Sequence, residues 1–279
     1  MKVETLPKIS VITPSYNQVQ FIERTIKSVI TQCYPNVEYI VIDGGSNDGS
    51  LEVIKKYDEK ISFWCSETDN GQYSAIKKGF SAATGDILCW INSDDMLLPG
   101  ALTKVASAFL ESDADVVFGD IVYADQDGVE IKVMRNTPLI KIGYLYHAGY
   151  GLSQPEVFWS REIYERVGGI DDRGQFSMDE DLFLRFIKAG ARFKHIRYKL
   201  SVLRFHPASK TSTISHVGQL ESSSLRQDLF LGNSHVFQKV IKVYVWILKT
   251  IYFIRRFEFR YLFGLVLYKI GVKTKDVAK

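Results

Sequence analysis

Short apolar runs and amphipathic helical patterns alternate four times in the first part of the chain. The apolar runs lie at residues 8–13, 37–42, 61–65 and 87–91, and a pattern of helical spacing follows each of them. This alternation is typical of parallel strands joined by helical crossovers, so we predict a mostly parallel sheet with helices on both faces. Pro14 is expected to end the first strand, because proline lacks the N–H that a sheet ladder needs. The expected helices span residues 21–33, 51–57, 72–83 and 99–110.

Polar or acidic side chains follow each of these four strands. The carboxyl ends of parallel strands meet at one edge of a sheet, which is where open α/β sheets bind their ligands. A single Asp after a strand is usually a helix cap or a turn residue, but an acid after nearly every strand is better explained by a binding site. The side chains concerned are Ser15, Asn17, Asp43, Asp69, Asp94 and Asp95.

Asp94 and Asp95 directly follow the buried strand at residues 87–91. Two adjacent carboxylates repel each other, and each needs a cation or hydrogen-bond donors. Mg²⁺ is often held by one or two carboxylates together with substrate phosphates. The ordinary alternative is that Asp94 begins a turn and that Asp95 caps the helix after Pro99.

The loops after the first two strands exclude two common nucleotide sites. Residues 14–17 stand where a dinucleotide-binding fold carries its glycine fingerprint. The loop at residues 44–50 has glycines at P-loop-like spacing, but Ser50 occupies the place of the phosphate-binding lysine. A nucleotidyltransferase would need a triphosphate loop rich in Gly, Lys or Arg after the first strand, and that loop is missing from the sequence. An acidic sheet edge suits a metal-bridged diphosphate and the hydroxyls of a ribose.

Composition agrees with a globular protein that has one large domain and an appendage. The chain has 279 residues, of which 46% are hydrophobic and 24% are charged, with a net charge of +3. That charge is too small to indicate nucleic acid as a partner. Three cysteines without metal-ligand spacing suggest reduced thiols and a cytoplasmic location. Residues 1–7 show no secretory signal, and no run of about 18 uncharged apolar residues predicts a membrane span.

Four sequence segments together resemble the family 2 glycosyltransferases of the GT-A fold. The resemblance covers roughly residues 8–212, and the combination of segments is specific although each one alone is not. It implies a Rossmann-like, mostly parallel sheet flanked by helices. The segments are Ile12-Thr13-Pro14-Ser15-Tyr16-Asn17, Ile42-Asp43-Gly44-Gly45-Ser46, Glu67-Thr68-Asp69-Asn70-Gly71 and Trp90-Ile91-Asn92-Ser93-Asp94-Asp95.

This resemblance implies a donor site for a nucleoside diphosphate sugar, with UDP as the expected nucleotide. Asp43 and Asp69 would hold the base and the ribose, and residues 14–17 would form the floor of the base pocket. This sequence departs from the family at Ser74 and Lys77, where Asp and Asn are common, so part of the sugar pocket differs. The expected floor residues are Pro14, Ser15, Tyr16 and Asn17.

The family's Asp-x-Asp motif falls on Asn92-Ser93-Asp94. The resemblance makes Asp94 the ligand of a divalent metal, Mg²⁺ or Mn²⁺, with Asp95 as a neighbour that helps. Asn92 departs from the strict motif, so its expected contact with the ribose is through an amide. In a segment resembling the family's His-x-x-Ser-x-Thr element, His206 is a candidate metal or diphosphate ligand and Lys210 a phosphate contact. A structural role for His206 is an equal alternative.

A second group of acids occurs at Asp179-Glu180-Asp181, where the pattern predicts the start of a helix. Acids in a first helical turn commonly stabilise the helix dipole. In the family, one Asp of this group is the general base, and the following Leu-x-x-Arg pattern puts it at Asp179, with Asp181 as second choice. A carboxylate within hydrogen-bond reach of the acceptor hydroxyl can take its proton. In-line attack by that hydroxyl inverts the anomeric carbon.

The region between these motifs contributes two further expected strands, at residues 115–123 and 193–203, and a hairpin turn at 125–128. Residues 136–153 contain tyrosines and glycines. An acceptor-binding loop and ordinary surface packing are both open interpretations of this segment.

The C-terminal tail differs in character from the rest of the chain. Residues 236–268 are rich in aliphatic and aromatic residues, and Glu258 is their one acid. Basic, aromatic, amphipathic helices often lie in a membrane interface, while packing on the catalytic domain or on a second subunit is the alternative. We therefore expect a GT-A domain at 1–215 and a helical region at 216–279, membrane-associated through 236–270. The basic residues are Lys239, Lys242, Lys249, Arg255, Arg256, Arg260 and Lys269.

The leading hypothesis is an inverting, metal-dependent glycosyltransferase that acts on a glycan acceptor, expected to be lipid-linked, in cell-surface polysaccharide synthesis. It would lie peripherally on the inner face of the cell membrane. The runner-up is a non-catalytic sugar-nucleotide-binding or membrane-tethered assembly protein that keeps the fold. The presence of Asp43, Asp69, Asp94 and Asp179 favours the enzyme.

Overall fold

The structure of the protein is a computed structural model that describes residues 6–146, 151–171, 176–213, 215–229 and 235–269. The chain forms two compact units. The first contains the sheet, and the second is helical. The predicted boundary after residue 215 lies a few residues before the end of the first unit, and the division into functional domains stays a prediction. The units are Met1–Asn136 with Leu152–Ser223, and Thr137–Gly151 with Ser224–Lys279.

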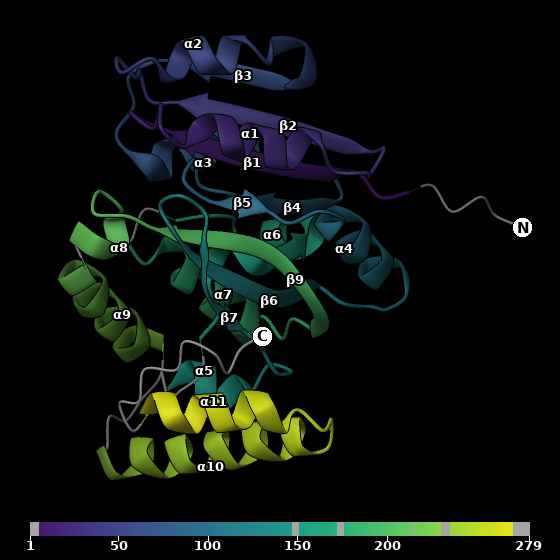
Figure 1. Cartoon of the computed structure of the whole chain (residues 1–279), viewed down its shortest axis with the longest axis vertical. Coiled ribbons are helices and arrows are strands. Elements are labelled where there is room, and N and C mark those ends of the chain that lie inside the picture. Colours follow the sequence, from purple (N-terminus) through teal and green to yellow (C-terminus); the bar gives the residue numbers. More distant parts are fainter. Residues whose placement is uncertain (1–5, 147–150, 172–175, 214, 230–234, 270–279) are drawn as a thin grey trace, which may run out of the picture. The chain divides into compact units, whose positions relative to one another are not determined.

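The described part of the first unit contains one mixed sheet in the order β3-β2-β1-β4-β8-β6-β9-β5, with β7 paired to β6 (Figure 1). The strands β1 to β4 are mutually parallel, as the sequence predicts. The strand β8 is antiparallel to both of its neighbours, whereas β6 and β9 are parallel. The bounds are β1 Ile9–Ser15, β2 Val37–Asp43, β3 Phe63–Ser66, β4 Ile87–Trp90, β5 Met96–Leu97, β6 Val116–Asp125, β7 Glu130–Met134, β8 Val157–Ser160 and β9 Phe193–Phe205.

The direction in which strands are added changes at β1. From β1 the chain adds β2 and then β3 on one side, and β4 pairs with β1 on the other side. This is a topological switch point, and the loops that leave the carboxyl ends of neighbouring strands separate there to leave a crevice. The polar residues that follow strands β1 to β4 are therefore brought to one place.

Strand β1 continues through Pro14 to Ser15, so the expectation that Pro14 ends the strand is wrong. The pairing of β1 with β4 stops at Ile12, opposite Trp90, whereas the pairing with β2 continues to Ser15. The backbone of Pro14 faces the same side as that of Ile12, whose carbonyl accepts from the residue after β4. The missing N–H of proline thus points to a side where β1 no longer has a partner.

Helices cover both faces of the sheet. On one face, Ile9 and Val11 of β1 pack in a buried cluster with Ile22 and Ile26 of α1. On the other face α3 lies against β1 and β2. A Cβ atom at Gly79 of α3 would lie 2.4 Å from the Ile12 side chain, so glycine permits this close packing. The bounds are α1 Ile22–Ile30, α2 Ser50–Lys55, η1 Asp58–Lys60, α3 Gln72–Ala82, α4 Ala101–Leu110, η2 Gln154–Glu156, α6 Arg161–Arg166, α7 Met178–Lys188, α8 Lys210–Thr213 and α9 Ser215–Leu229.

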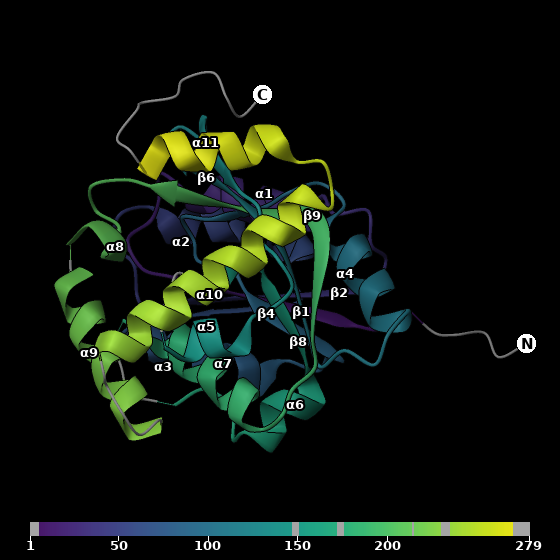
Figure 2. The ribbon, with the colours of Figure 1, turned by 90° about the horizontal axis from the view of Figure 1, so that it is seen from below.

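The second unit contains α5 (Lys141–Leu145), α10 (His235–Ile254) and α11 (Phe259–Lys269), which confirms the expected helical tail (Figure 2). Helix α10 contacts both α5 and α11, and the rings of Phe253 and Tyr261 lie 4.9 Å apart between α10 and α11. None of the helices in the described ranges has both the length and the apolar character needed to cross a membrane. Of the expected acceptor loop, residues 147–150 lie outside the described part of the chain.

Candidate active site

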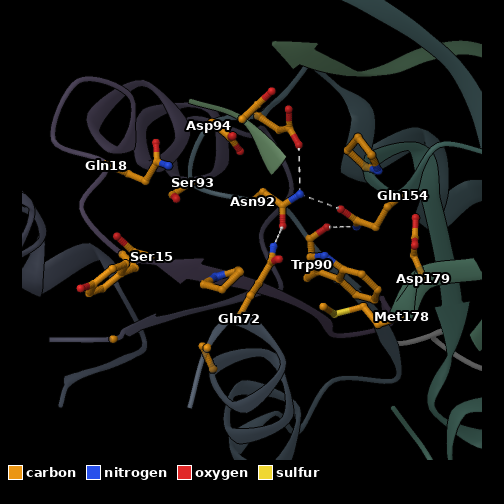
Figure 3. Close-up of a pocket in the computed structure, with 18 of the residues that line it drawn as sticks. Ser15, Gln18, Gln72, Trp90, Asn92, Ser93, Asp94, Gln154, Met178 and Asp179 are labelled. Atoms are coloured by element: carbon orange, nitrogen blue, oxygen red, sulfur yellow. Dashed lines mark hydrogen bonds between the residues drawn. The ribbon is translucent and has the colours of Figure 1, made fainter. Parts of the chain in front are cut away.

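A pocket of about 780 Å³ opens at the carboxyl ends of strands β1 to β4. Its walls come from the loops after these four strands, from η2, from the start of α7 and from the end of β9 (Figure 3). All of its lining residues belong to the first unit. The topology therefore gathers most of the predicted site residues at one crevice, as the position of the switch point requires.

One side of the pocket is formed by the residues predicted to bind the nucleotide. Pro14, Ser15, Tyr16 and Asp69 all line it. The hydroxyl of Ser15 is buried and has no hydrogen-bond partner among the residues that the structure describes. A Cβ atom at Gly44 would lie 3.1 Å from the Asp69 carboxylate, so glycine lets that carboxylate lie against the loop after β2.

Asp43 is completely buried and organises the loop that follows β2. Its Oδ2 atom accepts hydrogen bonds from the backbone N–H of Ser46 at 2.9 Å and from the hydroxyl of Ser66 at 2.6 Å. Its Oδ1 atom accepts from the Ser46 hydroxyl at 2.5 Å. These donors occupy most of the acceptor positions of a carboxylate, so Asp43 shapes the pocket wall. The base contact predicted for it stays a prediction.

Asn17 follows the neighbouring strand β1 and supports the same loop after β2. It adopts a left-handed backbone conformation with φ of 52°, which asparagine tolerates better than most residues. Its backbone N–H donates to the Ser46 hydroxyl at 2.8 Å, and its side-chain oxygen accepts from the Asn47 N–H at 3.0 Å. Asn17 thereby ties the loop after β1 to the loop after β2, and its contact with the base also stays a prediction.

Asp94 lines the pocket and pairs with His206, which follows β9. The Oδ2 atom of Asp94 lies 3.0 Å from Nε2 of His206, whose side chain is 2% exposed. The ring of Phe21 packs on the imidazole with the centroids 4.3 Å apart. The other imidazole nitrogen, Nδ1, is buried without a partner in the described part of the chain.

The Asp94–His206 pair fits a divalent metal. Two neighbouring ligands on an octahedral ion with bonds of about 2.1 Å lie about 3 Å apart, which is the separation of these two atoms. No group of three or more His, Cys, Asp or Glu side chains converges on a metal position within the described residues. Additional oxygen ligands would therefore come from a substrate diphosphate and water, as is usual for Mg²⁺.

Asp95 faces the protein more than the pocket. Its Oδ1 atom accepts from the backbone N–H of Arg204 at 3.1 Å, and its Oδ2 atom accepts from the Asn92 side chain at 3.3 Å. Burial, reinforced by the charge of Asp94, raises the pKa of Asp95 well above its ordinary value. Metal binding by Asp95 stays a prediction, and Asp94 is the better placed of the two carboxylates.

Three side-chain amides form a chain across the floor of the pocket (Figure 3). Gln72, the first residue of α3, donates to Oδ1 of Asn92 at 2.8 Å. The Nδ2 atom of Asn92 approaches Oε1 of Gln154 at 3.5 Å, and Gln154 donates to the carbonyl of Trp90 at 2.5 Å. Both groups of the Asn92 amide are thus engaged by protein atoms. The sequence gives no spacing signal that joins Gln72 and Gln154, since they meet only through the fold.

Asp179 lies in the first turn of α7 and lines the far side of the pocket. Desolvation raises the pKa of this carboxyl to about 6. The start of α7 is held by Glu221 of α9, which accepts from the backbone N–H groups of Phe176 and Ser177, each at 2.9 Å. Glu221 thereby fixes the turn from which Asp179 projects. No local spacing in the sequence signals this contribution of α9.

Two further predicted residues, Asp181 and Lys210, are not among the described residues that line the pocket. Asp181 is buried and forms an ion pair with Arg185 at 2.7 Å, which secures α7. Its role as the second choice for the base stays a prediction. Arg185 in turn donates to the carbonyls of Val167 and Gly169. Lys210 begins α8, and its side chain lies outside the described part of the structure.

The fold is of the GT-A type, with a polar pocket at the switch point of its sheet. Within that fold class the chain belongs to glycosyl transferase family 2, whose family model matches residues 10–168. The resemblance seen in the sequence motifs is thereby confirmed.

Comparisons with individual proteins agree with this family. The chain is 32% identical over 135 residues to the putative teichuronic acid biosynthesis glycosyltransferase TuaG of Bacillus subtilis, covering 47% of this chain and 54% of the relative. The crystal structure of S. aureus TarS 1–349 in complex with UDP-GlcNAc has a TM-score of 0.62 and 18% identity, covering 84% of this chain and 70% of that chain. The mannosyltransferase PcManGT from Pyrobaculum calidifontis in complex with GDP-Man and Mn²⁺ has a TM-score of 0.59 and 17% identity, covering 86% and 69%.

Because the sequence identity to the solved structures is low, the similarity to them shows the fold alone. The matched segment covers 56%, 76% and 34% of the length of the first three curated relatives. The activity and the substrates of this chain are therefore proposals.

Proposed function

We propose that the protein is an inverting, metal-dependent glycosyltransferase that uses a UDP-sugar as donor. The observation that carries this proposal is that Asp94 and Asp179 line the same pocket, with Asn92 and Gln154 between them (Figure 3). One carboxylate is paired with a histidine, and the other is desolvated and has a raised pKa. A metal–diphosphate end and a general-base end are the two parts that such a reaction needs.

Asp94 and His206 would hold Mg²⁺ or Mn²⁺ together with the donor diphosphate. The ion would stabilise the negative charge that develops on the departing diphosphate. Ser15, Gly44 and Asp69 would bind the nucleoside at the other side of the pocket, where the unpartnered hydroxyl of Ser15 is available.

Asp179 would take the proton of the acceptor hydroxyl. The hydroxyl oxygen then bonds to the anomeric carbon while the bond from that carbon to the diphosphate oxygen breaks. Attack from the side opposite the leaving group inverts the anomeric carbon, and no covalent enzyme intermediate is formed. A carboxyl with a pKa of about 6 is a better proton acceptor than an ordinary Asp and is still largely ionised near neutral pH.

The relatives support the choice of substrates. The TarS and PcManGT structures contain UDP-GlcNAc and GDP-Man with Mn²⁺, and TuaG is named for teichuronic acid synthesis. We therefore propose a glycan acceptor of cell-surface polysaccharide synthesis, carried on a lipid.

We also propose that the second unit binds the cytoplasmic face of the membrane. Helix α10 exposes an apolar stripe that repeats every three or four residues, including Val240, Tyr244, Ile247 and Ile251. Residues 236–269 contain seven Lys or Arg and one acid. An apolar face flanked by cations is suited to an anionic lipid surface, and this location would bring a lipid-linked acceptor near the enzyme.

The test is calorimetric titration of the purified full chain with UDP, first with Mn²⁺ and then with chelator, for wild type and Asp94→Ala. We expect binding that needs both the metal and Asp94, and transfer from a UDP-sugar when a panel of donors is supplied with lipid-linked glycans. Failure of UDP, GDP and dTDP to bind would overturn the proposal and favour a non-catalytic protein that keeps the fold.

A further inference from the structure

Arg204, near the end of β9, is buried directly beneath the turn that carries Asp94 and Asp95. Arg204 as a whole is 1% exposed. The Nε atom donates to the backbone carbonyl of Asp94, and the backbone N–H donates to the Asp95 carboxylate. One residue thus holds the turn both by its side chain and by its main chain.

Thr25 of α1 holds the same turn from the adjacent side. Its hydroxyl lies 2.7 Å from the carbonyl oxygens of both Ser93 and Asp95. The Nη2 atom of Arg204 lies 3.3 Å from that hydroxyl. The carbonyls of three successive residues, 93 to 95, are therefore fixed by Arg204 and Thr25 together.

The guanidinium also lies where two negative charges are close together. Asp94 and Asp95 repel each other, and the buried guanidinium of Arg204, which also lines the pocket, attracts both carboxyls and offsets part of that repulsion. Phe21 packs against this cation, with its ring centroid 5.0 Å from the guanidinium carbon, and against the His206 imidazole. Arg204 therefore holds the turn that carries Asp94, and it packs on the same Phe21 ring as His206.

We propose that Arg204, assisted by Thr25, is the positioning residue of the metal site: it holds the Asp94 turn in the orientation that binds a divalent cation and a nucleoside diphosphate. This inference rests on the proposed function and adds a residue that acts through the turn, by its bonds to the Asp94 carbonyl and the Asp95 carboxylate. Preorganised ligands bind more tightly because less ordering is needed at the moment of binding.

The test measures the apparent Kd of Mn²⁺ at a fixed UDP concentration, and separately the Kd of uridine with chelator present, by calorimetry on the full chain. Arg204→Lys keeps the charge but loses the planar fork. We expect the apparent Kd of Mn²⁺ to rise about tenfold or more, as for the loss of one hydrogen bond from a charged group. The Kd of uridine should stay within about twofold of wild type, because the nucleoside side of the pocket does not depend on this turn.

Thr25→Val, which keeps the shape and removes the hydroxyl, should shift the Mn²⁺ Kd in the same direction, and Thr25→Ser should restore it. Arg161→Lys is the matched control, since the Arg161 guanidinium also donates to backbone carbonyls, those of Gly85 and Ala83, at the opposite end of β4. We expect that control to lower the melting temperature without changing the Kd of Mn²⁺.

Two results would overturn the inference. One is an unchanged Mn²⁺ Kd in Arg204→Lys and Thr25→Val. The other is a parallel loss of Mn²⁺ and uridine binding, which would indicate general structural damage. If the wild type itself binds no UDP with Mn²⁺, the proposed function is wrong and this inference falls with it.

Discussion

The Oδ2 atom of Asp94 lies 3.0 Å from the Nε2 atom of His206, although 112 residues separate them in the chain. Asp94 follows strand β4, and His206 follows strand β9 at a distant position in the sheet order. The turn after β4 and the end of β9 meet because Leu98 and Leu200 are joined by a backbone hydrogen bond and Arg204 bonds to the Asp94 turn. In the proposed function, this pair would hold two ligands of a cation in place before the cation binds.

Replacing His206 by Gln should weaken metal binding. The amide is neutral and a poorer ligand than imidazole, so we expect the apparent Kd of Mn²⁺ measured with UDP to rise about tenfold or more. His195→Gln is a suitable control, because His195 lies in β9, the strand that precedes His206, and pairs with Asp120 at 3.1 Å. Calorimetry that finds the same Mn²⁺ affinity in wild type and His206→Gln would contradict a ligand role for this histidine.

The rate of transfer should depend on the ionisation of Asp179. Because its pKa is raised to about 6, the carboxylate is available as a base above that pH, and kcat should fall about tenfold for each pH unit below it. Asp179→Asn should lower kcat by about 10²-fold to 10⁴-fold and abolish this pH dependence, while UDP binding stays close to wild type. Asp181→Asn should lower stability, because Asp181 pairs with Arg185. Near-normal turnover by Asp179→Asn would rule out its assignment as the base.

Restoring the family's acid at position 92 should be harmful in this chain. The Nδ2 atom of Asn92 lies 3.3 Å from a carboxylate oxygen of Asp95 and 3.5 Å from Oε1 of Gln154. Asn92→Asp would place a third carboxylate against these acceptors, and we expect a loss of about 1–3 kcal/mol in the free energy of unfolding without metal. Thermal unfolding of Asn92→Ala provides the comparison, since alanine removes the bonds without adding charge. A variant Asn92→Asp as stable as wild type would contradict this reading of the amide chain.

Glu156 should make the stability of the protein depend on pH. It is 1% exposed, and desolvation, with the charge of Asp120, raises its pKa from 4.5 to about 8. The native state therefore keeps a proton that the unfolded chain releases near pH 4.5. The stabilisation is complete below pH 4.5 and is lost progressively as pH rises to about 8, at up to about 1.4 kcal/mol per pH unit.

The variant Glu156→Gln imitates the protonated acid and can still accept from Ser153 N–H and the Asn136 side chain through Oε1. Urea unfolding between pH 5 and 8 should show a shallower fall in stability for this variant than for wild type. Glu59→Gln, at an exposed position in η1, should behave as wild type. Equal slopes in all three proteins would mean that Glu156 is ionised in the native state throughout this range.

The apolar stripe of α10 should determine membrane binding. Ile247→Glu/Ile251→Glu places two charges in the stripe, and we expect it to abolish co-sedimentation with vesicles that contain phosphatidylglycerol. Val129→Glu/Ile131→Glu is a matched control in the first unit, because both of these apolar residues are 62% exposed. Binding should fall steeply when salt is raised or when the vesicles are pure phosphatidylcholine. Undiminished binding of the α10 variant would contradict the proposal.

Much of the fold could be predicted because local periodicity reflects the environment of each element. The runs that form β1, β2 and β4 are mostly apolar and buried at nearly every position, since both faces of these strands are covered by helices. The mistake at Pro14 shows the limit of this reasoning. Whether a missing N–H matters depends on how far the neighbouring strand extends, and the length of the β1–β4 pairing is a tertiary property.

Part of the candidate site could be predicted, from the acids that follow strands and from the family resemblance. Asp69, Asp94 and Asp179 line the pocket as expected. Gln72, Gln154, Arg204 and Glu221 were missed as site residues because each acts through a partner far away in the chain, and no local spacing marks that partner.

The sequence by itself determined the alternation of strands and helices, the family, and the set of acids at one edge of the sheet, because these depend on residues that are near neighbours in the chain. Only the tertiary structure decided what each acid faces. Asp94 meets a histidine and the pocket, whereas Asp95, one residue later, is buried against Arg204 and Asn92. The physical reason is that the environment of a carboxylate, its solvation and its hydrogen-bond donors, comes from elements that are distant in sequence and adjacent only after folding.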